Sequence, residues 1–136
     1  MKVYDLPEDE RIKQKKEFDV VYSSGKIIFS ETKKIKAIYC FLKNQNNPGT
    51  KVAFAIYKKA GNAVWRNRIK RLLRESYRLN KVELNELCKN KSQTLLLVFS
   101  LNSVNKKKYN KIFLKDLLPD VISIINNVKL TLKSQI

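Results

Sequence analysis

The residues that could do chemistry are concentrated between Lys58 and Arg78. This run holds eight Lys and Arg side chains and a single carboxylate, Glu75. Arg outnumbers Lys in it, and the planar guanidinium suits bidentate contacts to phosphate and stacking on bases. A solvated helix face usually mixes both signs of charge, whereas this run carries one sign. The pattern therefore predicts a surface that binds the phosphate backbone of a nucleic acid.

The same chain offers little for catalysis or metal binding. It has no histidine, which removes the commonest general base and the commonest zinc ligand. Its 12 Asp and Glu residues are scattered rather than grouped at catalytic spacing, and no Gly-rich phosphate loop occurs. Cys40 and Cys88 are too far apart for a Cys-x-x-Cys motif and are expected to be reduced. We therefore expect neither catalytic residues nor a bound metal in the protein alone.

Composition points to the same class of partner. A length of 136 residues with 43% hydrophobic content fits one domain, residues 1–136. The net charge of +17 exceeds what solubility requires and favours nucleic acid over a membrane, because the single Trp is better used in packing the basic helix. No apolar segment follows Met1–Asp5, and no run approaches the roughly 18 apolar residues of a membrane span. We therefore expect a cytoplasmic protein that does not contact membranes.

The basic run is predicted to be a helix. Gly61 provides a turn, Asn62 is the N-cap, and the helical pattern continues to about Leu79. Cations four residues apart repel one another along a helix, and a polyanionic partner would remove that cost. At roughly 100° per residue, one side gathers Trp65, Ile69, Leu72, Leu73, Ser76 and Leu79, and the other gathers Arg66, Asn67, Lys70, Arg71, Arg74 and Arg78.

The elements that must position this helix are expected to form an α+β fold. An amphipathic helix from Lys13 ends at Gly25, and its Phe18, Val21 and Tyr22 follow helical spacing. Because these aromatics stand among lysines, they could be core residues or a platform for single-stranded nucleic acid. The remaining predictions are a strand over 34–43, a turn over 44–49, its antiparallel partner over 51–57, a polar connector over 80–92, and a buried central strand over 93–99.

A last amphipathic helix is predicted over 112–126. Pro119 lies inside it, so the helix either kinks there or begins one turn before. The predicted order is α-β-β-α-β-α, which makes a two-layer α-β sandwich. The basic helix joins two strands that should be parallel neighbours.

The basic run also resembles a known signature. The string Lys58-Lys59-Ala60-Gly61-Asn62-Ala63-Val64-Trp65-Arg66-Asn67-Arg68-Ile69-Lys70-Arg71 is similar to the signature of the bacterial ribonuclease P protein subunit. A looser similarity extends over nearly the whole chain and includes Arg11-Ile12-Lys13, Glu17 to Tyr22 and Gly25-Lys26. The resemblance implies a ribosomal-protein S5 domain-2-like fold with a left-handed β-α-β crossover, against the general preference for right-handed crossovers.

The resemblance further implies a function. The family's protein subunit assists an endoribonuclease, a ribonucleoprotein that removes the 5′ leader of precursor tRNA in tRNA processing. Its catalytic RNA subunit performs the hydrolysis and holds most of the Mg²⁺, and no protein partner is required. The residues implied to bind the RNA subunit are Lys58, Arg66, Asn67, Arg68, Lys70, Arg71 and Arg74, and those implied to bind the leader are Phe18, Tyr22 and Tyr39.

The chain departs from the family's pattern at several positions. Ala53 and Tyr57 stand where Gly and Ser are more usual. Basic residues usually follow the central strand near Phe99 and Ser100, and this chain has none there, although three lysines, 106–108, come a few residues later.

Two other classes of function share the same composition. A ribosomal-type protein would bind structured RNA without a catalytic role, and would not copurify with a catalytic RNA. A metal-dependent nuclease would cleave precursor tRNA as pure protein with Mg²⁺. Short motifs match by chance at times, so both alternatives stay open at this point.

Overall fold

A four-stranded mixed sheet organises the chain in the computed structural model, which describes residues 6–43 and 47–135. The strands lie in the order β1-β2-β4-β3. β2 pairs antiparallel with both β1 and β4, and β3 pairs parallel with β4. The strands are β1 (Lys26–Phe29), β2 (Ile35–Lys43), β3 (Gly49–Phe54) and β4 (Gln93–Leu101).

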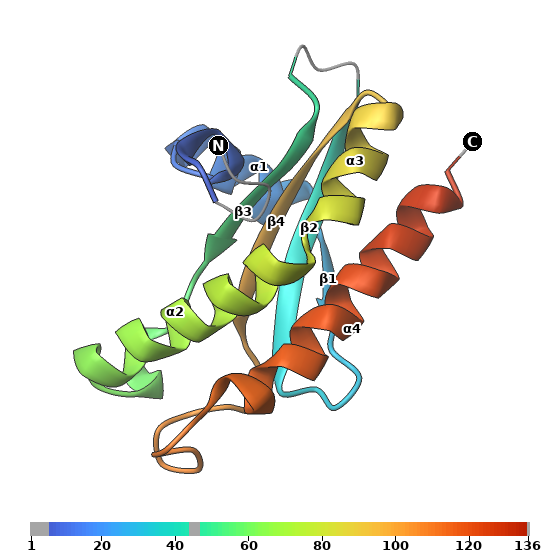
Figure 1. Cartoon of the computed structure of the whole chain (residues 1–136). Helices are drawn as coiled ribbons and strands as arrows, with labels where there is room; N and C mark the ends of the chain where they lie inside the picture. Colours follow the sequence, from blue (N-terminus) through green and yellow to red (C-terminus); the bar gives the residue numbers. More distant parts are fainter. Residues whose placement is uncertain (1–5, 44–46, 136) are drawn as a thin grey trace.

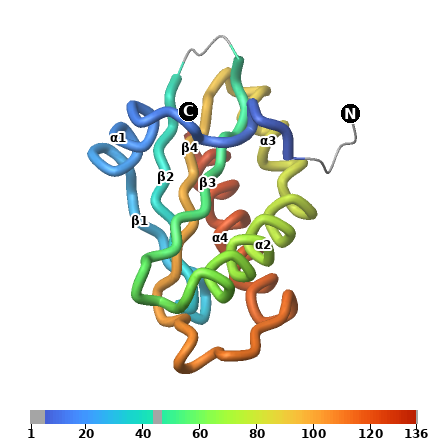
Figure 2. The backbone as a smooth tube through the Cα atoms, turned by 90° about the vertical axis from the view of Figure 1, so that its left-hand side faces the viewer, coloured from blue at the N-terminus to red at the C-terminus, as the bar shows by residue number. Residues whose placement is uncertain are grey.

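Helices cover the two faces of the sheet unequally. Helices α2, α3 and α4 pack on one face, and α1 lies on the other (Figure 1). Figure 2 shows the same layers edge-on, with the sheet between α1 and the group of three helices. The helices are α1 (Lys15–Ser24), α2 (Ala63–Asn80), α3 (Val82–Asn90) and α4 (Leu114–Lys133), with 3-10 turns η1 (Glu8–Glu10) and η2 (Lys58–Ala60).

Strand β4 takes the centre of the sheet because it is apolar on both faces. Leu95, Leu97 and Phe99 face the three helices, and Leu96 and Val98 face α1. This confirms the predicted buried strand and the parallel pairing of the two strands joined by the basic helix. The predicted hairpin is wrong, however, because β2 and β3 flank β4 instead of pairing with each other.

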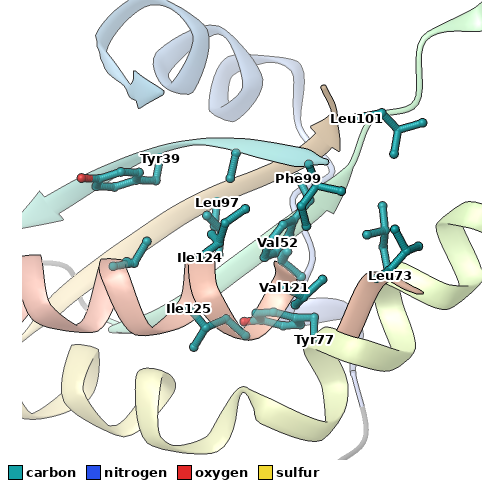
Figure 3. Close-up of a cluster of buried hydrophobic side chains, with 14 of the residues drawn as sticks. Tyr39, Val52, Leu73, Tyr77, Leu97, Phe99, Leu101, Val121, Ile124 and Ile125 are labelled. Carbon is teal, nitrogen blue, oxygen red and sulfur yellow. The ribbon is translucent and has the colours of Figure 1, made fainter. Parts of the chain in front are cut away.

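The alternation of side chains along β2 and β3 divides the interior into two cores. Ile35, Ala37 and Tyr39 of β2 join the larger core under α2, α3 and α4 (Figure 3). Ile38, Cys40 and Leu42, on the other face of β2, join the smaller core under α1. On β3, the same division places Val52 and Phe54 in the larger core and Ala53 in the smaller one.

Two elements were absent from the predicted order α-β-β-α-β-α. β1 is a four-residue edge strand, too short to show a clear alternation, although Ile27-Ile28-Phe29 has strand composition. The predicted polar connector over 80–92 contains α3, whose Leu84 and Cys88 are buried. Such a short helix has little intrinsic stability, so packing of its apolar side decides that it forms.

Helix α4 runs through Pro119 and is longer than predicted. It begins at Leu114, about one turn before the proline, and continues to Lys133. The hydroxyls of Ser30 and Thr32 both donate to the buried carboxylate of Asp120, which ties the turn after β1 to this helix. These two hydrogen bonds hold α4 against the turn that leads into β2.

Candidate nucleic-acid interface

Asn62 and Gly61 determine where α2 begins. The side-chain oxygen of Asn62 accepts a hydrogen bond of 2.9 Å from the backbone N–H of Trp65, which confirms the predicted N-cap. A Cβ on Gly61 would lie 2.6 Å from the Trp65 ring and 3.0 Å from Cβ of Lys106. Glycine is therefore required here by close approach.

The apolar side of α2 packs as predicted, with two exceptions. Trp65, Ile69 and Leu73 are buried against the sheet and α4. Leu79 is 42% exposed, contrary to the prediction, whereas Tyr77 is fully buried between Phe54 and Phe99. Tyr77 was on neither side of the predicted helix, and its aromatic neighbours from β3 and β4 extend the core to reach it.

The other side of α2 presents cations and one amide to solvent. Asn67, Arg71 and Arg74 are exposed, as is Lys58 in η2, while Arg66 and Lys70 are half-buried. In the described part of the chain, the Nε of Arg66 is buried without a hydrogen-bond partner. An unpaired buried donor is costly, and a phosphate oxygen would supply the acceptor.

Arg78, at the end of this row, is already paired within the protein. Its guanidinium donates to the carboxylate of Glu75, and that hydrogen bond lowers the pKa of Glu75 from its usual 4.5. Glu75 is the only acid of the basic run. The acid of the basic run is therefore paired outside the row of cations between Arg66 and Arg74.

Arg68 differs from the other predicted RNA-binding residues. Its Nε and Nη2 donate to the backbone carbonyl of Ile112, at 3.0 and 2.7 Å. Its guanidinium also lies 5.9 Å from the centre of the Phe113 ring. The prediction grouped Arg68 with the phosphate contacts, but the structure gives it an internal partner, because the segment before α4 passes beside α2.

The second predicted site lies on the opposite face of the sheet. The rings of Phe18 and Tyr22 stack one turn apart on α1, with centroids 6.4 Å apart. Phe18 is half-buried in the smaller core, whereas Tyr22 is 55% exposed. Beside Tyr22 is a cavity of about 230 Å³, lined also by Ile27, Lys36, Ala37, Ile38 and Ser100.

The structure does not bring Tyr39 together with Phe18 and Tyr22. Tyr39 is 7% exposed and packs in the larger core (Figure 3). Its ring is edge-on to that of Phe41, with the centroids 5.7 Å apart. Its position in β2 points it away from α1, because successive side chains alternate between the faces of a strand. It lines a different cavity, of about 280 Å³, with Lys26 and Gln135. The three aromatics predicted to line one leader cleft therefore lie at two cavities, although Val20 and Ser24 of α1 also line the one that contains Tyr39.

Sequence reasoning did not single out the strand residues that lie beside Tyr22. Lys36 and Ile38 of β2 and Ile27 of β1 line the cavity beside Tyr22. Side chains alternate between the faces of a strand, so the sequence itself puts Lys36 and Ile38 on the face opposite Tyr39. What was missing was the side of the sheet on which α1 packs.

An ion pair fixes α1 on the sheet. Lys51 of β3 donates to Glu17 at 2.9 Å, directly before Phe18. Burial would raise the pKa of Glu17, but the hydrogen bond and positive charge of Lys51 outweigh it and hold this pKa below 4.5. The ion pair therefore orients the helix that carries both aromatics.

We expect the Glu17 ion pair to stabilise the protein at neutral pH and to lose this stabilising effect in acid. A carboxyl whose pKa is lowered in the folded state contributes stability above its unfolded pKa and loses it as pH falls through the folded value. Glu17→Gln should therefore cost up to about 1 kcal/mol of unfolding free energy at pH 7 and almost nothing at pH 2. Urea unfolding at both pH values measures this, with exposed Glu86→Gln as control. An equal cost at both values would contradict it.

Two further features of the described residues, 6–43 and 47–135, concern other kinds of site. None of their helices is long and apolar enough to cross a membrane. Within the same residues, no three His, Cys, Asp or Glu side chains gather to hold a metal ion. Burial raises the pKa of both thiols, Cys40 and Cys88.

Comparison with known proteins gives one consistent family. The sequence profile of the family described as Ribonuclease P matches residues 6–118. A ribonuclease P protein component of Clostridium novyi is 37% identical over 106 residues, which cover 78% of this chain and 85% of that protein. One of Clostridium botulinum strain Loch Maree is 39% identical over 105 residues, covering 76% and 85%.

Solved structures resemble the fold at lower identity. A Staphylococcus aureus RNase P protein mutant with defective mRNA degradation activity matches with a TM-score of 0.60 at 19% identity, over 89% of each chain. The RNase P protein of Thermotoga maritima matches with a TM-score of 0.58 at 19% identity, over 87% of this chain and 96% of its own. These two likenesses concern the fold alone.

Proposed function

Because the chain belongs to the ribonuclease P protein family, we propose that it is the protein subunit of a ribonuclease P ribonucleoprotein. In this role it binds the catalytic RNA subunit and the 5′ leader of precursor tRNA, and assists removal of the leader. The observation that carries the proposal is the single-sign row on α2, where Arg71 and Arg74 are exposed. In the same row, the buried Nε of Arg66 has no hydrogen-bond partner among residues 6–43 and 47–135. Phosphate groups of RNA would neutralise all three.

The two faces of the molecule have different proposed partners. The RNA subunit binds Lys58 and the α2 residues Arg66, Asn67, Lys70, Arg71 and Arg74. The leader binds across the sheet face that carries α1, with Tyr22 and Phe18 as the stacking platform and Lys36 near the phosphates. In this proposal Mg²⁺ is held mainly by RNA, and the protein contributes no catalytic residue.

The proposal also covers the form of the protein. We take residues 1–136 as one domain, acting in the cytoplasm, with the left-handed crossover expected of a ribosomal-protein S5 domain-2-like fold between β3 and β4. No additional protein partner is required for the proposed assembly.

Reconstitution tests the proposed function. We expect the cognate RNA subunit with this protein to cleave precursor tRNA at the 5′ end of the mature sequence faster than the RNA alone at limiting Mg²⁺. The reason is that the protein's cations replace some of the counterions that the folded RNA needs. Pure protein with Mg²⁺ should not cleave.

Two results would contradict the proposal in different ways. Cleavage by pure protein, abolished by chelation, would indicate a metal-dependent nuclease. Equal affinity for the RNA subunit and for unrelated structured RNA, with no effect on cleavage, would indicate a ribosomal-type RNA-binding protein.

A further inference from the structure

The segment between β4 and α4, residues 102–113, forms a second basic element. It holds four lysines and no carboxylate. Lys107, Lys108 and Lys111 are exposed, and Lys106 is half-buried. We call residues 105–111 the lysine loop. Since it carries charge of one sign, it shares the property that distinguishes α2 from an ordinary solvated surface.

The lysine loop is fixed against the beginning of α2. The backbone N–H of Lys106 donates to the carbonyl of Ala60 at 2.7 Å, and the indole N–H of Trp65 donates to the carbonyl of Tyr109 at 2.9 Å. Beyond the loop, Arg68 holds the carbonyl of Ile112, and Ile112 itself is buried. In Figure 2 this orange segment lies beside the green turn that leads into α2.

This docking has an electrostatic cost for the free protein. It bonds the backbone of Lys106 to Ala60, the last residue of η2, which also carries Lys58 and Lys59. Like charges held close together repel, so the arrangement opposes stability unless a polyanion is bound. Four hydrogen bonds and a buried Ile112 nevertheless keep the loop there.

We propose that the lysine loop is a second binding element for the phosphate backbone of the same folded RNA that α2 binds, and that Arg68 positions this loop instead of contacting phosphate. The proposal rests on the proposed function and deepens it. Lysine ammonium groups bind phosphate as point charges and read no base identity, so the loop adds affinity without sequence preference. Arg68 positions the loop by donating hydrogen bonds to the carbonyl of Ile112.

The loop is tested by the salt dependence of binding to the cognate RNA subunit. Replacing Lys107 and Lys108 by Gln should lower the slope of log affinity against log salt by close to one for each phosphate that is no longer neutralised. The matched control is Lys26→Gln with Lys89→Gln, which removes the same charge from exposed lysines of β1 and α3. We expect the control slope to equal that of the unmodified protein. Equal slopes for the loop variant and the control would overturn the proposal.

A double-mutant cycle tests the role of Arg68. Arg68→Met keeps the aliphatic length and removes the donors to Ile112. If Arg68 positions the loop, Arg68→Met should weaken RNA binding alone but add little to the Lys107→Gln/Lys108→Gln variant. Additive losses, with a further slope decrease near one, would show that Arg68 contacts phosphate and would overturn its positioning role.

A second measurement is independent of RNA. The amide proton of Lys106 is bonded to Ala60, so Arg68→Met should increase its exchange with solvent, whereas Lys107→Gln/Lys108→Gln should not. Unchanged exchange in Arg68→Met would overturn the positioning role even if this variant binds RNA poorly. If the protein binds unrelated folded RNA as tightly as the cognate subunit, the proposed function is wrong. The slopes of log affinity against log salt, measured on that RNA for the loop variant and its control, then still decide whether the lysine loop binds phosphate.

Discussion

The affinity of the protein for the ribonuclease P RNA is expected to fall by about 10³-fold or more between 50 and 200 mM salt. Six to ten phosphate contacts predict a loss of about this size, because each neutralised phosphate releases condensed counterions. The exposed cations of η2, α2 and the lysine loop are numerous enough to make that many contacts. Filter binding or fluorescence titration across this salt range measures the slope directly.

Charge removal within the row should change this slope. Arg71→Gln with Arg74→Gln removes two exposed cations of α2 and should lower the slope by close to two. Both side chains are exposed, so each substitution should alter the unfolding free energy by no more than about 0.5 kcal/mol. A flat salt response of the unmodified protein would exclude the electrostatic interface.

The sequence predicted those parts of the fold that depend on local pattern. The N-cap at Asn62, the buried β4 and the terminal helix all follow from residue type and spacing within one element. The pairing of the strands did not follow, because the turn predicted over 44–49, of which 44–46 lie outside the described residues, fits both a hairpin and a sheet with β4 inserted. The decisive fact was available: a strand that is apolar on both faces fills the centre better than the edge.

The candidate sites were predicted to different degrees for a related reason. The row on α2 lies within one helix, so its exposed side could be read from periodicity. The proposed leader site combines α1 with two strands, and the sequence does not say which face of β2 meets α1. The resemblance grouped Tyr39 with Phe18 and Tyr22, whereas Tyr39 packs on the other face of the sheet. It also grouped Arg68 with the RNA-binding residues, because a hydrogen bond to Ile112, 44 residues further along the chain, cannot be read from local pattern.

We expect Tyr22→Ala to weaken binding of leader-containing precursor tRNA to the assembled enzyme by about 5- to 150-fold. One stacked base contributes roughly 1 to 3 kcal/mol by alanine substitution, which corresponds to this range. Tyr22 is 55% exposed and stacks on Phe18, so it offers an open ring face at little cost to folding. Affinity for mature tRNA, which has no leader, should be nearly unchanged.

Phe18 and Tyr39 are poorer probes than Tyr22, since both are packed in a core. Replacing either by Ala should cost several kcal/mol of stability, which would obscure an effect on binding. Tyr22→Phe is the useful counterpart, because it keeps the ring and should retain the affinity for precursor. Tyr39→Phe keeps the packing of the larger core and should leave the affinities for precursor and mature tRNA unchanged.

Precursors with leaders of different length test whether the Tyr22 ring contacts the leader. Precursors with one nucleotide and with several nucleotides of leader should differ in their sensitivity to Tyr22→Ala if the cavity beside Tyr22 holds part of the leader. Circular dichroism of each variant shows whether α1 is retained. Equal losses for the short leader, the long leader and mature tRNA would place the effect outside a leader site, and selective loss in Tyr39→Phe would move the site to the opposite face of the sheet.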